Sequence, residues 1–199
     1  MKGEGVKGEG VKGEGRIGPR AKLLALVSLF ALPIVASFTA YHFYTPDKTS
    51  NYGELLTPAP VTTQVLGRAG GGPFRFEELR GKWVLVASDS GACAEACREK
   101  LATMRQVRLA LGRNASRVER VFVVDDLRPP DTAALQPFAG TLVAITPAGM
   151  TLPPVPANDR AHIYVIDPRG DVMMRFPAAT DRKKMLHDLN RLLRASQIG

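Results

Sequence analysis

Cysteine, histidine and tryptophan are scarce in this sequence. Its 199 residues include two cysteines, three histidines and one tryptophan, so a second pair of soft metal ligands beside the cysteines is absent. The chain also lacks any run of five basic residues and any stretch of interleaved arginine and aromatic side chains, which argues against a nucleic-acid-binding protein. With 45% apolar and 23% charged residues, collagen-like and wholly disordered classes are excluded, and one globular domain with an appendage is expected.

The net charge of +8 is unevenly divided along the chain. Residues 1–46 hold six Lys/Arg against three Glu, a surplus of +3, and the remainder holds twenty-one against sixteen acidic residues, a surplus of +5. A surplus of that size is mild for a domain of about 150 residues. Acidic partners and anionic lipid therefore stay open as binding partners.

A short repeat opens the chain. Lys-Gly-Glu-Gly-Val occurs at 2–6 and 7–11, and Lys-Gly-Glu-Gly follows at 12–15. A period of five residues is too short for a repeat protein, and low apolar content with alternating glycine is typical of disorder. We predict that residues 1–22 form a disordered cytoplasmic tail, a solvated expansion rather than a binding segment.

A run of twenty-two residues without a charged side chain follows, from Leu23 to Tyr44. A helix of that length spans the hydrocarbon layer of about 30 Å. Arg16, Arg20 and Lys22 precede it, so the positive-inside rule places the N-terminus in the cytoplasm. We predict a transmembrane helix at 23–44 in the inner (cytoplasmic) membrane, with the C-terminal domain in the periplasm. The alternative is a cleaved signal peptide, whose apolar region is usually shorter.

The rest of the chain predicts a tether and one α/β domain. Residues 45–73 are rich in proline and glycine and read as a flexible tether with a short strand at Val61–Leu66. Residues 74–199 show buried-type strands alternating with amphipathic helices, which predicts a thioredoxin-like sandwich. The expected strands are Trp83–Ala87, Val118–Val124, Thr141–Ile145, Ile163–Ile166 and Val172–Phe176.

The two cysteines, Cys93 and Cys97, lie between the first of these strands and its helix. A helix that starts at Asp89 or Ser90 places Cys93 in the first turn, where the helix dipole lowers the pKa of a thiol. Cysteines four apart share a helix face with Cα atoms about 6 Å apart, near the upper limit for a disulfide. We predict a strained and therefore reversible disulfide. The charged residues of this helix, Lys100 among them, are expected on its other faces.

Two alternatives concern the same pair. Both cysteines could be small core side chains, because Cys97 is in phase with Leu101 and Met104. Two thiolates also suit Cu(I), and an imidazole would complete a trigonal site. His162 is the candidate for the third ligand, because it opens a strand after an irregular segment. His42 lies at the membrane interface and His187 on the terminal helix, so neither is expected to bind metal.

Three motifs resemble one family. They are the Leu79-Arg-Gly-Lys-Trp-Val-Leu-Val segment, the C-x3-C after the first strand, and His162-Ile-Tyr-Val-Ile-Asp-Pro-Arg-Gly. Together with the single membrane anchor they resemble the Sco/SenC-type proteins, over about Phe74–Ala195. The resemblance implies a thioredoxin-fold copper chaperone of cytochrome c oxidase assembly. Asp159 stands where the family's histidine usually falls.

The resemblance also implies residue roles and partners. Cys93, Cys97 and a histidine would hold copper for delivery, or the cysteines would reduce the thiols of the oxidase's dinuclear copper centre. The partner would be the oxidase subunit carrying that centre, or its assembly factors. A membrane-tethered thiol-disulfide oxidoreductase, which needs an exposed Cys93 of low pKa, and a non-catalytic interaction module are the competing hypotheses.

The predicted topology can be tested with reporter fusions at Gly199. An alkaline phosphatase fusion should be active and a cytoplasmic reporter at the same position inactive, because the basic residues precede the apolar run. The reverse pattern would place both cysteines in a reducing compartment and remove the basis for a stable disulfide.

Overall fold

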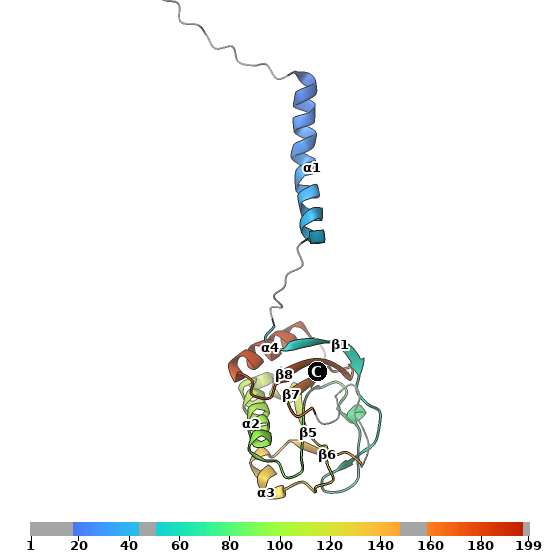
Figure 1. Ribbon diagram of the computed structural model, residues 1–199, viewed down its shortest axis with the longest axis vertical. Coiled ribbons are helices and arrows are strands. Elements are labelled where there is room, and N and C mark those ends of the chain that lie inside the picture. Colours follow the sequence, from blue (N-terminus) through green and yellow to red (C-terminus); the bar gives the residue numbers. More distant parts are fainter. Residues whose placement is uncertain (1–17, 44–50, 148–158, 197–199) are drawn as a thin grey trace, which may run out of the picture. The chain divides into compact units, whose positions relative to one another are not determined.

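The computed structural model describes residues 18–43, 51–147 and 159–196 (Figure 1). They divide into two compact units, one up to Thr49 and one from Ser50 onward. In the first unit, helix α1 runs from Pro19 to Phe43 and is long and apolar enough to cross a membrane. It starts four residues before the predicted Leu23, because proline is favoured at the first helical position and Arg20 and Lys22 are good helix formers. Most of the predicted disordered tail lies outside the described residues.

The second unit is built on one mixed eight-stranded sheet with the order β1-β8-β7-β4-β5-β6-β2-β3. Strands β4, β5 and β6 are parallel, and the remaining neighbours pair antiparallel. The strands are β1 Glu54–Pro60, β2 Leu66–Arg68, β3 Pro73–Phe74, β4 Trp83–Asp89, β5 Val118–Val124, β6 Leu142–Ile145, β7 His162–Ile166 and β8 Asp171–Pro177. All five strands predicted in the domain proper are confirmed.

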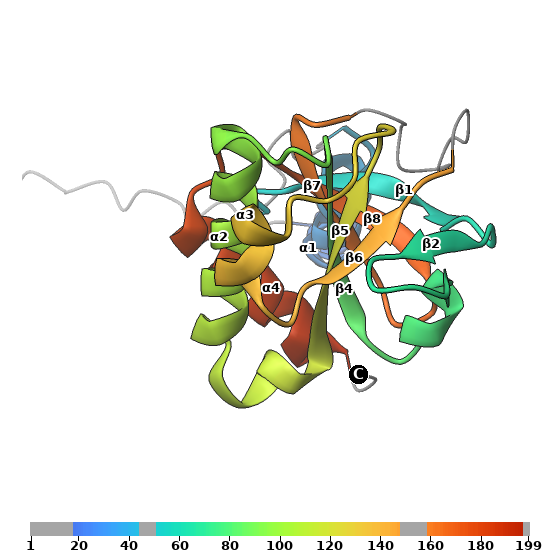
Figure 2. The same ribbon diagram turned by 90° about the horizontal axis from the view of Figure 1, so that it is seen from below.

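Helices cover one face of this sheet. They are α2 (Glu95–Ala110), the short α3 (Thr132–Leu135) and α4 (Arg182–Ala195), and Figure 2 shows all three on the same side. Apolar side chains of α2 and α4, such as Leu101 and Leu189, pack there against Leu85 and Phe122 of the central strands. The predicted thioredoxin-like α/β sandwich is confirmed.

The opposite face of the sheet is covered by a segment that was expected to be a tether. Leu66, Phe74 and Phe76 are buried against the outward side chains of β4, such as Val84 and Val86. This corrects the prediction for residues 45–73, since from Asn51 onward that segment supplies β1, β2 and β3. The strand expected at Val61–Leu66 is not formed: β1 ends before it at Pro60, and β2 begins at its last residue, Leu66. A central strand buried on both faces needs this second apolar layer.

The start of the domain is fastened to α4 through one buried carboxylate. Asp188 is 2% exposed, and its Oδ2 accepts hydrogen bonds from the backbone amides of Tyr52 (2.8 Å) and Gly53 (2.9 Å). Gly53 is needed here, because an added Cβ would lie 2.6 Å from the Phe176 ring. The contact therefore fixes where β1 begins.

Replacing Asp188 by alanine should destabilise the domain. Two backbone amides would lose their acceptor, which should lower the free energy of unfolding by about 2–4 kcal/mol. Urea unfolding followed by circular dichroism measures this. His187→Ala is the matched control, because its side chain is exposed on the same helix and should change stability by less than about 0.5 kcal/mol. Equal stability of the parent and Asp188→Ala would contradict this role.

Candidate functional site

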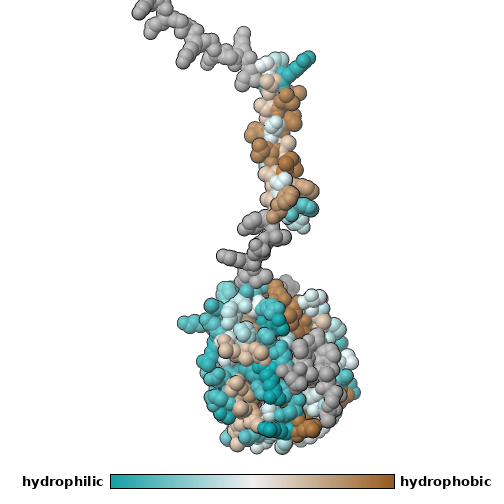
Figure 3. Space-filling model, viewed as in Figure 1, coloured by the Kyte–Doolittle hydropathy of each residue, from teal (hydrophilic) through white to brown (hydrophobic). Residues whose placement is uncertain are grey.

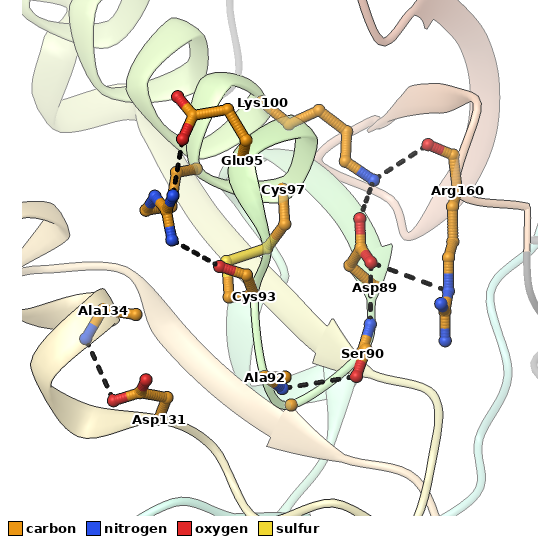
Figure 4. Close-up of a disulfide and its surroundings, with 12 residues drawn as sticks. Asp89, Ser90, Ala92, Cys93, Glu95, Cys97, Lys100, Asp131, Ala134 and Arg160 are labelled. Carbon is orange, nitrogen blue, oxygen red and sulfur yellow. Dashed lines mark hydrogen bonds and ion pairs between the residues drawn. A yellow bond between two sulfur atoms is a disulfide. The ribbon is translucent and has the colours of Figure 1, made fainter.

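The cysteine pair lies in the connection between β4 and α2 (Figure 4). Helix α2 begins at Glu95 after the N-cap residue Ala94, not at Asp89 or Ser90 as predicted. The reason is local: Asp89 is still a strand residue, and Cys93 has a left-handed backbone (φ 38°) that no helix accommodates. Cys93 therefore precedes the helix, and Cys97 is the cysteine that lies in its first turn.

The structure joins Cys93 and Cys97 in a disulfide, as predicted. Their Cα atoms lie 5.0 Å apart, closer than two positions on one helix face, because Cys93 is outside the helix. The residues are 0% and 1% exposed and belong to the apolar core between sheet and helices. The core-packing alternative is thus correct about burial, and the exposed Cys93 that the oxidoreductase hypothesis requires is not seen in the oxidised state.

The loop that carries Cys93 is held by the segment after β5. The Gly91 amide donates to Asp126 Oδ1 (3.0 Å), and the Gly91 carbonyl accepts from the Asp131 amide (2.9 Å). A Cβ at Gly91 would lie 2.1 Å from the Arg128 carbonyl oxygen. Only glycine therefore allows the two segments to pack this closely.

A half-buried arginine spans the cysteine loop from α2. Arg98 Nη1 donates to the Cys93 carbonyl (3.3 Å), and Nη2 pairs with Glu95 (2.5 Å). Both contacts are local, within five residues of the chain. They link the backbone of Cys93 to the first turns of the helix that holds Cys97.

A buried lysine lies beside the disulfide, one turn after Cys97. Lys100 is 1% exposed, and its Nζ lies 2.8 Å from Asp89 Oδ2, 2.8 Å from the Ser88 carbonyl and 2.9 Å from the Arg160 carbonyl (Figure 4). Three oxygen acceptors satisfy the ammonium group completely. Lys100 was expected on a face of the helix other than the apolar one, and this is wrong. The helical spacing could have indicated its burial, since Lys100 is three residues after Cys97 and adjacent to the buried Leu101.

This lysine is the centre of a charge network at the carboxyl ends of β4 and β5. Arg160, just before β7, pairs with Asp125 (2.5 Å) and lies 3.7 Å from Asp89. The side chains of Asp89 and Asp125 are largely buried, and each has a cationic partner. The network therefore joins the disulfide loop to the start of β7.

His162 opens β7 and is held by a carboxylate. Its Nδ1 lies 2.8 Å from Asp159 Oδ2, and Tyr164 donates its hydroxyl to the same oxygen. Burial would raise the pKa of Asp159, but the hydrogen bonds from Tyr164 and His162 outweigh it and hold that pKa below its usual value. Burial, with the hydrogen bond to Asp159, raises the pKa of Tyr164 to about 12. Asp159 therefore stays ionised near neutral pH and orients the imidazole.

The predicted three-ligand metal site is not assembled here. Within residues 18–43, 51–147 and 159–196, no three His, Cys, Asp or Glu side chains gather closely enough to hold a metal ion. Cys93 and Cys97 are together, and His162 is bound to Asp159 instead. His42 lies in α1 and His187 on the exposed side of α4.

Solved structures with the same fold include both Sco proteins and a thiol-disulfide oxidoreductase. Apo Sco1 from Thermus thermophilus is 18% identical, with a TM-score of 0.57 over 73% of this chain and 99% of that one. Copper-bound yeast Sco1 is 14% identical, with a TM-score of 0.55 over 75% of this chain and 96% of that one. The thioredoxin domain of a thiol-disulfide oxidoreductase from Bacteroides vulgatus is 15% identical, with a TM-score of 0.50 over 70% of this chain and 97% of that one. At these identities the likeness concerns the fold.

Comparison at the level of sequence gives a family for this chain. The curated proteins include no match. One family model matches residues 83–196, which is more than half of the chain and includes both cysteines, His162 and helix α4. The protein is therefore a member of the family described as the transmembrane-like, thioredoxin-like, C-terminal domain.

Proposed function

We propose that this protein is a membrane-anchored thiol-disulfide oxidoreductase whose redox pair is Cys93 and Cys97. The observation that carries the proposal is the disulfide at the junction of β4 and α2, with Cys97 in the first turn of the helix. Thiols exported from the cytoplasm become oxidised, and the basic residues before α1 favour export of this domain. A small local loop also adds little stability to a fold, which argues against a purely structural bond.

The helix N-terminus assigns different roles to the two sulfurs. Unpaired backbone amides and the helix dipole stabilise a thiolate on Cys97. Cys97 is therefore the better leaving group, and a client thiolate attacks Cys93 Sγ to form a mixed disulfide while the S–S bond breaks. A second client thiolate then attacks the client sulfur of that bond and releases Cys93. The client loses two electrons and two protons, and this protein gains them as two thiols.

The reverse sequence reduces a client disulfide and regenerates the Cys93–Cys97 bond. It needs a dithiol donor that first reduces this protein. By the Sco/SenC resemblance, the client would be the thiol pair of the dinuclear copper centre of cytochrome c oxidase. The domain would act in the periplasm, attached to the inner membrane by α1.

Access to the sulfurs is the main constraint on this chemistry. The two residues are 0% and 1% exposed, so a client cannot reach Cys93 until the loop before α2 moves. Arg98 opposes that movement through its hydrogen bond to the Cys93 carbonyl. The rate of exchange should therefore depend on this contact.

Arg98→Ala should speed reduction of the disulfide. Loss of a hydrogen bond of about 1 kcal/mol corresponds to about a fivefold faster reaction with dithiothreitol, if loop opening limits the rate. Reduction of the full chain in nanodiscs is followed by timed alkylation and mass spectrometry. Arg105→Ala is the matched control, an exposed arginine on the same helix. Equal rates for both variants would show that Arg98 does not limit loop opening. A parent disulfide that resists reduction until the protein is denatured would overturn the proposed function.

The second candidate function is carriage of Cu(I). It is favoured by the copper-bound Sco1 structure of the same fold and by the orientation of His162, because a carboxylate on Nδ1 leaves Nε2 as the free ligand atom. The oxidised pair does not fit copper, since both sulfurs are in the S–S bond. Reduction would supply the two thiolates, and His162 would be the third ligand.

The copper candidate predicts a specific order among variants. After reduction, Cys93→Ser and Cys97→Ser should each abolish Cu(I) binding, because one soft ligand is lost. His162→Ala and Asp159→Asn should each weaken it by about 10- to 100-fold, the first by losing a ligand and the second by losing its orientation. Competition against a Cu(I) chelator measures the affinities. Identical binding by the parent and His162→Ala would exclude His162, and no binding by the reduced parent would leave thiol-disulfide exchange alone.

A further inference from the structure

The solvent side of α4 carries a continuous basic surface. Its members are exposed and, at 3.6 residues per turn, fall within an arc of about 100°: Lys183, Lys184, His187, Arg191 and Arg194. We call this set the basic face of α4. Met185, Leu189 and Leu193 occupy the opposite side of the helix and are buried in the core. Asp188, the one acidic residue of this fully described helix, is buried against the Tyr52 and Gly53 amides.

The carboxylate that begins this helix, the exposed N-cap residue Asp181, accepts from the backbone amides of Lys183 and Lys184. Among the residues that the structure describes, Lys183, Lys184 and Arg194 form no ion pair within 4.0 Å. Lys184 lies over the Tyr52 ring at 5.1 Å, and Arg194 donates to a carbonyl of its own helix. Figure 3 shows a mainly hydrophilic surface over this part of the domain. The neighbouring helix α2 differs, because it also exposes Glu95 and Glu99.

The chain connects this face to α1 through a short segment. Asn51, Tyr52 and Gly53 are fastened to α4: Asn51 Oδ1 accepts from Arg191, and the next two amides donate to Asp188. Residues 44–50 join them to Phe43, the last residue of α1. Seven residues span at most about 25 Å when fully extended. The helix to which the domain's entry point is bound is therefore the helix that carries the basic face.

We propose that the basic face of α4 binds anionic phospholipid headgroups of the membrane in which α1 is anchored. Each Lys or Arg near such a surface strengthens binding by about fivefold, so several together would hold a domain that seven residues connect to its anchor. Screening limits this attraction to about 10 Å from the surface, which makes the tether length important. The inference concerns a surface distinct from the cysteine pair and does not depend on the proposed redox function.

Acetylation of the lysines tests this on the full chain. The protein is placed in nanodiscs of phosphatidylcholine alone or with phosphatidylglycerol, and labelling of Lys183 and Lys184 is read by mass spectrometry. We expect labelling to be several-fold slower with phosphatidylglycerol, and the difference to disappear in 0.5 M salt, where charge attraction is screened over a few ångströms. Equal labelling in both lipids would overturn the proposal. Slow labelling in both lipids that salt does not speed up would also overturn it, since the lysines would then be shielded by something other than lipid charge.

A charge-matched pair of variants locates the surface. Lys183→Glu with Arg194→Glu reverses two charges of the basic face and should abolish the lipid-dependent protection of Lys184. Arg105→Glu with Arg113→Glu changes the net charge equally at exposed positions outside α4 and should leave that protection within about twofold. Loss of protection in both pairs would mean that net charge alone attracts the domain, and would contradict a site on α4.

Discussion

The ammonium group of Lys100 is the fixed point around which the cysteine site is arranged. A buried cation is tolerated only with close oxygen partners. Here two of them, the Ser88 carbonyl and the Asp89 carboxylate, come from the end of β4, and the third is the Arg160 carbonyl before β7. The loop with Cys93 starts directly after Asp89, so the ion pair sets its origin. The same lysine is one turn from Cys97, so its side chain connects the helix that carries Cys97 to the strand end from which the Cys93 loop departs.

This arrangement bears differently on the two chemistries that the sequence left open, copper binding and thiol exchange. The sulfurs lie in the core between sheet and helices, whereas the imidazole of His162 is half exposed and held by Asp159. Asp159, which stands where the histidine of the Sco/SenC-type proteins usually falls, is the partner that orients His162. Thiol exchange requires the sulfurs alone, while copper binding requires the histidine to join them. The oxidised structure accordingly supports exchange more directly.

The sequence predicted strongly periodic elements well and short-range geometry poorly. β5 agrees residue for residue with the predicted Val118–Val124, because its second half, Val121–Val124, is the uninterrupted apolar run that a strand buried on both faces shows. The covering layer around Leu66 and Phe74 was missed, since its strands are two or three residues long and its prolines and glycines indicate a linker. The start of α2 was misplaced because a left-handed residue such as Cys93 has no sequence signal. Cysteine in that conformation depends on tertiary contacts.

The close approach at Gly91 means that the cysteine loop cannot move as an isolated segment. The Arg128 carbonyl lies against it, and hydrogen bonds from both sides connect it to Asp126 and Asp131. Any opening that uncovers the sulfurs must shift residues 125–131 as well. Leu127 projects from that segment with 81% of its surface exposed. A partner that contacts this leucine would therefore touch the segment that packs directly against the cysteine loop.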